Sequence, residues 1–219
     1  MRYEQDVVEI DPTMPPVERL DVLMEWVLAD SRRPDVIDLS RAIVSDAIAR
    51  GSASPDDPVS HLQALLDWQQ RAVRYQEDPT DPATGQQKEL FKRAYRAISD
   101  REDDCEGKVT VYCTMATAVG YASMPAWIEQ PRARNNHVAA LSAVPAWAAR
   151  SLPTPGDYPS VVILPSIRPH VAGATWAWAE TTLGDVVTPA GLVRGPLVGE
   201  HPFDVLARFR AVGVARVHL

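Results

Sequence analysis

The sequence predicts an α+β fold in which N-terminal helices and a central, cysteine-bearing helix pack on an antiparallel sheet. Up to Gly120, apolar residues recur mainly with the 3.6-residue period of helices, and beyond it the apolar runs are short and typical of strands. This order, with helices first and strands afterwards, is typical of α+β proteins and differs from the alternation that produces a parallel sheet.

Four helices are expected before the central one. A short strand at Val7–Ile10 comes first, and the Asp11-Pro12 pair ends it. The first two helices begin near Pro16 and Pro34, because proline suits the first helical turn. Loops rich in Ser, Pro and Asp separate the helices. The four expected helices span residues 16–29, 34–51, 57–75 and 87–98.

The central helix is expected to begin at Cys105 and to end at Gly120. Asp104 suits the N-cap position, and Gly120 suits the left-handed residue that ends many helices. Apolar side chains cover much of the circumference, as is typical of a buried helix. They are Val109, Val111, Tyr112, Cys113, Met115, Ala116, Ala118 and Val119. Unpaired N–H groups and the helix dipole at the first turn predict a lowered pKa for the Cys105 thiol.

Strand-like segments follow Gly120. A Pro-rich insertion, residues 145–172, separates the second strand from the third and contains one short apolar run at 161–164. A short final helix is expected at 203–209. The expected strands span residues 124–129, 137–144 and 175–183, with shorter candidates at 186–187 and 192–193.

The composition excludes several classes of function. The net charge of -7 and the lack of a Lys/Arg-rich run argue against nucleic acid as a partner. No apolar run approaches the roughly 18 residues that span a membrane, and the N-terminus has no apolar signal region. Cys105 and Cys113 lie about 12 Å apart along one helix, too far for a disulfide. The five histidines are scattered, so neither a metal nor a cofactor is expected.

Three residues form a candidate catalytic set. Cys105 opens the central helix, His137 opens a strand and Glu180 lies inside a later strand. A thiol nucleophile needs a base, and the base needs an orienting group, so cysteine, imidazole and carboxylate are the expected residue types. The alternative for Cys105 is a packed, unreactive side chain.

Six segments follow, in order, the motifs of a known family. They are Val73–Tyr75, Asp78-Pro79, Asp103–Gly107, Gly120–Trp127, Asn136–Val138 and Trp178–Thr182. Together they resemble the transglutaminase-like cysteine peptidase superfamily of bacteria and phages. Its pattern is Gly-Asp-Cys-Asp-Asp, a helix, Gly-Ile-Pro-Ala-Arg, a strand with the histidine and a strand with an aspartate. The resemblance covers residues 60 to 185 approximately and implies a papain-like fold.

The chain departs from this family at two points. The third member is normally aspartate, and Glu180 is one methylene longer, so its backbone is expected to sit further back. The long insertion also leaves His170 as an alternative base, although Arg168-Pro169 marks a loop there. The oxyanion hole is expected to use the Cys105 N–H and one further donor, for which Tyr75 and Gln70 are candidates.

The resemblance implies thiol acyl transfer, most simply hydrolysis of a peptide or amide bond through a Cys105 thioester. An amine in place of water would make the chain a protein cross-linking transglutaminase. The alternative without enzymatic activity is a structural or interaction module, for example in a phage-like particle, with a relaxed triad. The expected partner is a protein or peptide substrate, or a virion or other protein assembly. The expected location is the cytoplasm, or the virion if a phage encodes the chain.

A single transglutaminase-like domain is expected over residues 1–219. Within it, residues 1–58 form a helical extension, 59–185 the catalytic-type core and 186–219 a tail that packs on the core.

Four further residues are expected to be structural. His61 is expected at the surface or near a helix cap, and Cys113 in the core. Trp176 and Trp178 alternate with alanine, so both rings face one side of their strand. They either pack in the core or line an acyl-binding groove.

Overall fold

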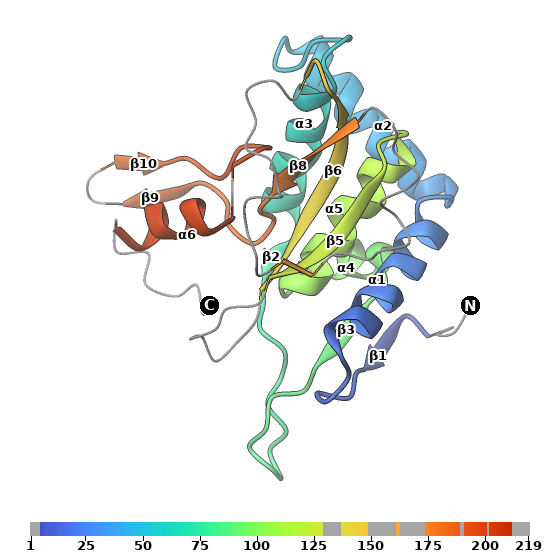
Figure 1. Cartoon of the computed structure of the whole chain (residues 1–219), viewed down its shortest axis with the longest axis vertical. Coiled ribbons are helices and arrows are strands. Elements are labelled where there is room, and N and C mark those ends of the chain that lie inside the picture. Colours follow the sequence, from blue (N-terminus) through green and yellow to red (C-terminus); the bar gives the residue numbers. More distant parts are fainter. Residues whose placement is uncertain are drawn as a thin grey trace.

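A computed structural model describes residues 5–128, 137–148, 161–162, 174–188, 191–200 and 202–211. It shows a mixed α+β chain (Figure 1). The helices are α1 (Pro16–Asp30), α2 (Pro34–Ala49), α3 (Pro58–Ala72), α4 (Ala94–Asp100), α5 (Cys105–Ala118) and α6 (Pro202–Ala211). The strands are β1 (Val7–Glu9), β2 (Arg74–Tyr75), β3 (Leu90–Lys92), β4 (Glu102–Asp103), β5 (Ser123–Ile128), β6 (His137–Pro145), β7 (Val161–Val162), β8 (Ala174–Ala179), β9 (Val186–Thr188) and β10 (Gly191–Val193).

The main sheet has the strand order β7-β5-β6-β8, and every neighbouring pair is antiparallel. Ile128 at the end of β5 pairs with His137 at the start of β6. Ala140 of β6 pairs with Ala179, the last residue of β8. The register therefore brings the first residues of β6 and the last residues of β8 to the same end of the sheet.

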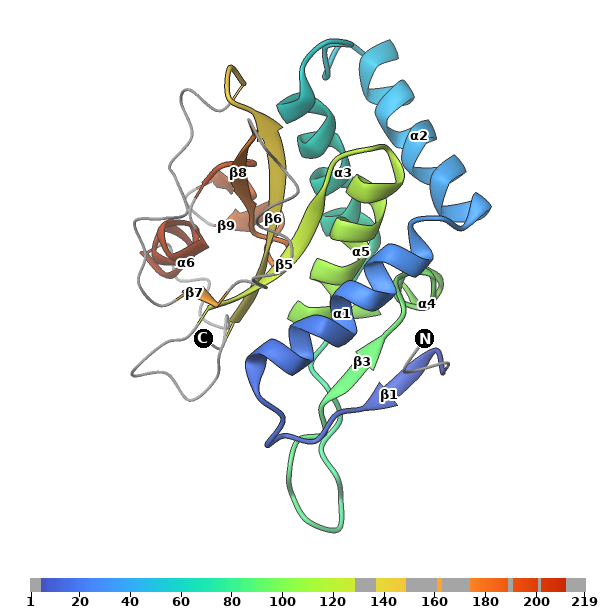
Figure 2. The same cartoon turned by 45° about the vertical axis from the view of Figure 1, so that its right-hand side comes forward.

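Helix α5 is the centre of the structure. Figure 2 shows the main sheet on one side of α5 and the helices α1, α2 and α4 on the other. All residues from Glu106 to Ala116 are buried, as the all-round apolar pattern predicts. Asp104 is the N-cap, and Gly120 has the positive φ of 98° that ends the helix, so both predicted ends are confirmed.

The N-terminal helices share their apolar core with the cysteine helix. Leu20 and Val27 of α1 belong to the same buried cluster as Val109 and Tyr112 of α5. Helix α1 also packs on β5, and α3 packs on β6. Towards the other end of the chain, Val198 joins this cluster, while α6 buries Val205 and Phe209 against Leu183.

The predicted fourth helix is wrong in its first half. Residues 90–92 form β3, which pairs antiparallel with β1, and the helix begins only at Ala94. The buried Asp30 carboxylate at the end of α1 accepts hydrogen bonds from the Arg93 guanidinium and from the Ala94 N–H. This distant carboxylate fixes the start of α4, and local periodicity does not reveal it.

The other predicted elements agree in type with the structure. The third helix ends at Ala72 instead of near Tyr75, and the strand expected to reach residue 183 ends at Ala179. Glu180 therefore lies just beyond β8. The short strands predicted at 186–187 and 192–193 pair as the β9–β10 hairpin. In the described part of the chain, no helix has the length and apolarity needed to cross a membrane.

Candidate active site

Cys105 is the first residue of α5. The Asp104 carboxylate caps the helix by accepting hydrogen bonds from the N–H groups of Glu106 (3.1 Å) and Gly107 (3.3 Å). A Cβ at position 107 would lie 1.9 Å from Cγ of Asp103, so any larger residue there requires this buried carboxyl group to move. Cys105 is half-buried and Cys113 fully buried, and neither forms a disulfide.

His137 and Glu180 form a buried pair. Nε2 of His137 lies 2.6 Å from Oε2 of Glu180, and the two side chains are 4% and 0% exposed. The other carboxylate oxygen, Oε1, accepts hydrogen bonds from the N–H of Thr182 (2.8 Å) and from its hydroxyl group. The structure thus joins the predicted base to the predicted acid, and leaves Nδ1 of the imidazole as the nitrogen not occupied by Glu180.

The thiol lies against the start of β6. The backbone N–H of Val138, the residue after His137, faces the Cys105 sulfur and only partly offsets the burial and charges that raise the pKa of the thiol. A direct contact between the Cys105 thiol and the His137 ring stays a prediction. His170, the alternative base, lies outside the described residues.

The predicted lowering of the thiol pKa is wrong in this arrangement. Sγ of Cys105 donates to Oε2 of the buried Glu106 at 2.7 Å. Burial, followed by the negative charges of Glu106 and Asp104, raises the pKa of the Cys105 thiol well above its ordinary value. Burial and the two neighbouring acidic side chains therefore outweigh the helix N-terminus and keep the thiol protonated at neutral pH.

More carboxyl groups gather near Glu106. Burial is the largest cause of a raised pKa for each, and the charge of Glu106 adds to it. The pKa is about 6 for Asp78, and about 7 for Glu89 and for Asp103. The pKa of Asp104 lies well above its ordinary value. Among the described residues, no cluster of histidine, cysteine and carboxylate side chains is arranged to hold a metal ion.

In the His137–Glu180 pair, unlike the carboxyl groups near Glu106, both groups have pKa values shifted towards their charged forms. Burial lowers the pKa of His137, but the charge and hydrogen bond of Glu180 outweigh it, so the pKa is raised. Burial raises the pKa of Glu180, but His137 and Thr182 outweigh it and lower the pKa. Each group therefore favours the charged form of the other.

Sequence reasoning missed or misassigned several neighbours of this site. Gln70, a candidate oxyanion donor, instead donates from Nε2 to the backbone carbonyl of Glu180 at 2.9 Å. Tyr75 is 39% exposed and lies near the charges of Cys105 and Asp104, and its role as a donor stays a prediction. Lys108 is 1% exposed and donates to the Val73 carbonyl. Burial lowers its pKa to about 8, although Glu180 and Asp103 act in the other direction.

The residues expected to be structural have the expected surroundings. His61 bonds the Tyr121 hydroxyl (2.7 Å) and the Ser54 carbonyl (2.8 Å), which fixes the first turn of α3. Cys113 is 0% exposed. Trp178 is buried in an apolar cluster, against which the half-buried Trp176 packs.

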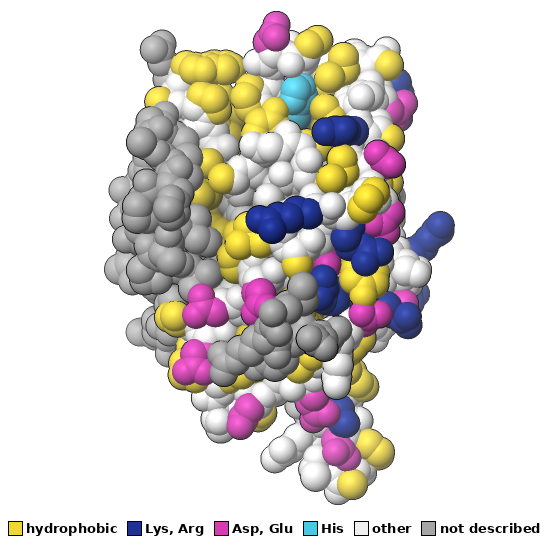
Figure 3. Space-filling view, turned by 90° about the vertical axis from the view of Figure 1, so that its right-hand side faces the viewer, with side chains coloured by type: hydrophobic (Ala, Val, Ile, Leu, Met, Phe, Trp, Pro, Cys, Tyr) yellow, Lys and Arg dark blue, Asp and Glu magenta, His cyan; other side chains and the backbone are white. Residues whose placement is uncertain are grey.

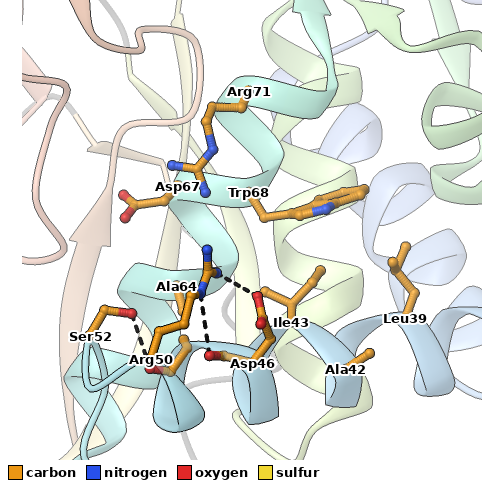
Figure 4. A pocket seen from close by; sticks show the side chains of 11 residues that line it. Leu39, Ala42, Ile43, Asp46, Arg50, Ser52, Ala64, Asp67, Trp68 and Arg71 are labelled. Carbon is orange, nitrogen blue, oxygen red and sulfur yellow. Dashed lines mark hydrogen bonds and ion pairs between the residues drawn. The ribbon is translucent and has the colours of Figure 1, made fainter.

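On the face in Figure 3, Lys and Arg side chains lie in the middle and at the right, next to Asp and Glu, while the lower left of the described surface carries Asp and Glu. Figure 4 shows a hollow between α2 and α3, where Arg50 and Asp46 pair beside Trp68 and Arg71. Its lining does not include Cys105, His137 or Glu180.

Comparison with family models, curated proteins and solved structures gives no significant match to this chain. The case for a site at Cys105 therefore depends on the geometry and on the resemblance of its motifs.

Proposed function

We propose that this chain has a transglutaminase-like fold and catalyses thiol acyl transfer, most simply the hydrolysis of a peptide or amide bond. The observation that carries the proposal is the buried His137–Glu180 pair, 2.6 Å between Nε2 and Oε2, at the start of the strand whose next residue, Val138, faces the cysteine of the helix start. A base oriented by a carboxylate and a half-buried thiol are two parts that nucleophilic catalysis needs. The substrate would be a protein or peptide.

The raised thiol pKa favours general-base catalysis over a preformed thiolate–imidazolium pair. Nε2–H donates to Glu180, which leaves the lone pair of the neutral ring on Nδ1. Nδ1 would take the proton of Cys105 as its sulfur attacks the substrate carbonyl carbon. The imidazolium would then protonate the leaving amine, which departs as the thioester forms. The backbone N–H of Cys105 is the expected donor to the oxyanion.

The second half of the reaction reverses these proton transfers. Nδ1 of His137 would remove a proton from water, and the resulting hydroxide attacks the thioester carbon. The proton then returns to the departing thiolate, which gives the free acid and restores the Cys105 thiol. With an amine in place of water, the same steps would form a new amide, as in a cross-linking transglutaminase.

Glu106 has to release the thiol before the first step. In the resting arrangement the thiol proton points to Oε2 of Glu106. Rotation about the Cα–Cβ bond of Cys105 would redirect it to His137. The same contact favours a second candidate function, a structural or interaction module within a virion or other protein assembly, in which the thiol stays protonated.

The two candidates differ in the pH dependence of Cys105 alkylation. If His137 acts as the base, Cys105 reacts faster at neutral pH with an electrophilic peptide probe than with a small reagent such as iodoacetamide. In His137→Ala, this difference in rate should disappear. A thiol that only packs reacts slowly with both reagents until the pH exceeds its raised pKa. Buried Cys113 serves as the internal control, because it should remain unmodified under native conditions.

A further inference from the structure

The backbone of Glu180 is held from outside the sheet. Its residue follows Ala179, the last residue of β8 in the ladder with β6. Nε2 of Gln70, from α3 and 110 residues earlier, donates to the Glu180 carbonyl oxygen at 2.9 Å. A helix side chain therefore provides the support that strand pairing gives to the residues before Glu180.

The chain after Glu180 returns closely to the same side chain. A Cβ at Gly184 would lie 3.6 Å from Cβ of Gln70. A Cβ at Gly195 would lie 3.1 Å from Oε1 of Gln70, closer than a side chain comfortably allows. The segments that follow Glu180 therefore pack against the half-buried Gln70 and leave room only for glycine beside its amide oxygen.

The carboxylate of Glu180 is fixed separately from its backbone. Thr182 binds Oε1, and His137 binds Oε2. A glutamate has one more rotatable bond than the aspartate usual in the resembled family. Its carboxylate reaches the ring correctly only if the backbone is held at a matching distance.

Building on the proposed function, we propose that Gln70 is a positioning residue, which sets the backbone of Glu180 so that a glutamate, rather than an aspartate, orients His137. Gln70 acts through Glu180 and needs no contact with the substrate. Its role differs from that of the oxyanion donor expected from the sequence, because its donor group is directed at the Glu180 carbonyl.

Helix α3 offers a matched control. Gln63 lies two turns before Gln70 and also ties α3 to a later part of the chain. Its Oε1 accepts from the Val198 N–H at 2.7 Å, and its Nε2 donates to Asp67 at 2.6 Å. No contact of Gln63 involves Glu180 among the described residues. Replacing Gln63 should therefore loosen a similar tether without affecting the acid.

The experiment replaces each glutamine by methionine, which keeps the length and removes the donor. The pKa of His137 is measured by NMR titration of its ring nitrogens and assigned by comparison with His137→Gln. We expect Gln70→Met to lower this pKa by about half a pH unit or more, because Glu180 moves away from the ring. We expect Gln63→Met to leave it unchanged. Urea denaturation of Gln70→Met and Gln63→Met shows whether either variant has a general folding defect.

A double-mutant cycle tests whether Gln70 holds the backbone at the distance that a glutamate side chain needs. In the wild-type background, Glu180→Asp should slow acylation of Cys105 by the peptide probe, because the fixed backbone leaves the shorter side chain out of reach. In the Gln70→Met background, the same substitution should cost at least about threefold less, because the backbone can follow. Multiplicative losses, or an unchanged His137 pKa in Gln70→Met, would overturn the proposal. The NMR titration needs no catalysis, so it decides the role of Gln70 even if Cys105 proves unreactive.

Discussion

Two buried glutamates lie near the proposed reacting groups. Each raises the pKa of its neighbour, but the consequences for proton removal from the thiol are opposite. Glu180 meets an imidazole ring and the hydroxyl and N–H groups of Thr182, and it raises the pKa of His137. Glu106 accepts a hydrogen bond from the Cys105 thiol and lies near further carboxyl groups. Its negative charge adds to burial in raising the pKa of the thiol. Both effects follow from one rule, that a negative charge favours bound protons nearby.

The difference assigns different tasks to the two sides of the site. Around Glu180, a raised imidazole pKa means a stronger base, which helps proton removal. Around Glu106, a raised thiol pKa means a weaker acid, which resists proton removal. The proposed enzyme would therefore depend on His137 to ionise a thiol that its own helix start does not activate.

Gly107→Ala should have the largest effect, because it disrupts the thiol side. Its Cβ would collide with the Asp103 carboxyl group at 1.9 Å, beside the N-cap of α5. We expect the free energy of unfolding to fall by about 2–4 kcal/mol, measured by urea denaturation. Gly184→Ala is the control, since its Cβ would meet only an ordinary contact at 3.6 Å. Equal losses in both variants would contradict the assigned crowding at position 107.

Glu180→Gln should disrupt the imidazole side with little change in shape. It removes the charge that favours the protonated ring and can stabilise the wrong tautomer. We expect acylation of Cys105 by a peptide probe to slow about tenfold or more, and Glu180→Asp to be milder. NMR titration should show a lower pKa for His137 in Glu180→Gln. Equal acylation rates in the three proteins would exclude Glu180 from the chemistry.

Glu106→Gln should remove the negative charge that opposes ionisation of the Cys105 thiol. Loss of its negative charge lowers the pKa of the Cys105 thiol, so the alkylation profile shifts to lower pH. We expect about a threefold or greater increase in the rate with iodoacetamide at pH 7. Glu102→Gln is the control, since Glu102 pairs with Arg74 at the surface. An unchanged profile in Glu106→Gln would show that Glu106 does not hold the thiol proton.

Asp103→Asn should change the pH dependence of stability rather than the chemistry of the site. Burial raises the pKa of Asp103 from 3.8 to about 7, so the folded protein loses stability as the pH rises through this interval. Asparagine does not ionise and avoids this loss. We expect the stability of the variant relative to wild type to be about 2–3 kcal/mol more favourable at pH 8 than at pH 5. The same difference at both pH values would mean that Asp103 does not titrate in this range.

The sequence was sufficient for elements whose signals are local. Helices α1, α2 and α5 have strong periodicity and clear end residues, and their predicted starts at Pro16, Pro34 and Cys105 agree with the structure. The start of α4 has no such local signal, so the prediction of the fourth helix is wrong in its first half. Its start depends on Asp30 and on pairing with β1, and both are distant in the sequence.

The candidate site divides in the same way. Residue type and order were enough to select His137 and Glu180, and the structure joins them. The raised thiol pKa was not predictable, because its largest cause is the burial of Cys105 in the folded chain, to which the charges of its sequence neighbours Glu106 and Asp104 add. The contact between Gln70 and Glu180 spans 110 residues and involves a side-chain direction that no sequence pattern reports.

The central claim, acyl transfer through Cys105, is tested most directly by trapping the thioester. The protein is mixed with an activated peptide ester, quenched in acid and digested, and the masses of the cysteine-containing peptides are measured. The account predicts an acyl group on Cys105, absent from buried Cys113, which forms more slowly in His137→Ala and disappears as water hydrolyses it. No adduct on Cys105, or an adduct that forms equally fast without His137, would contradict it.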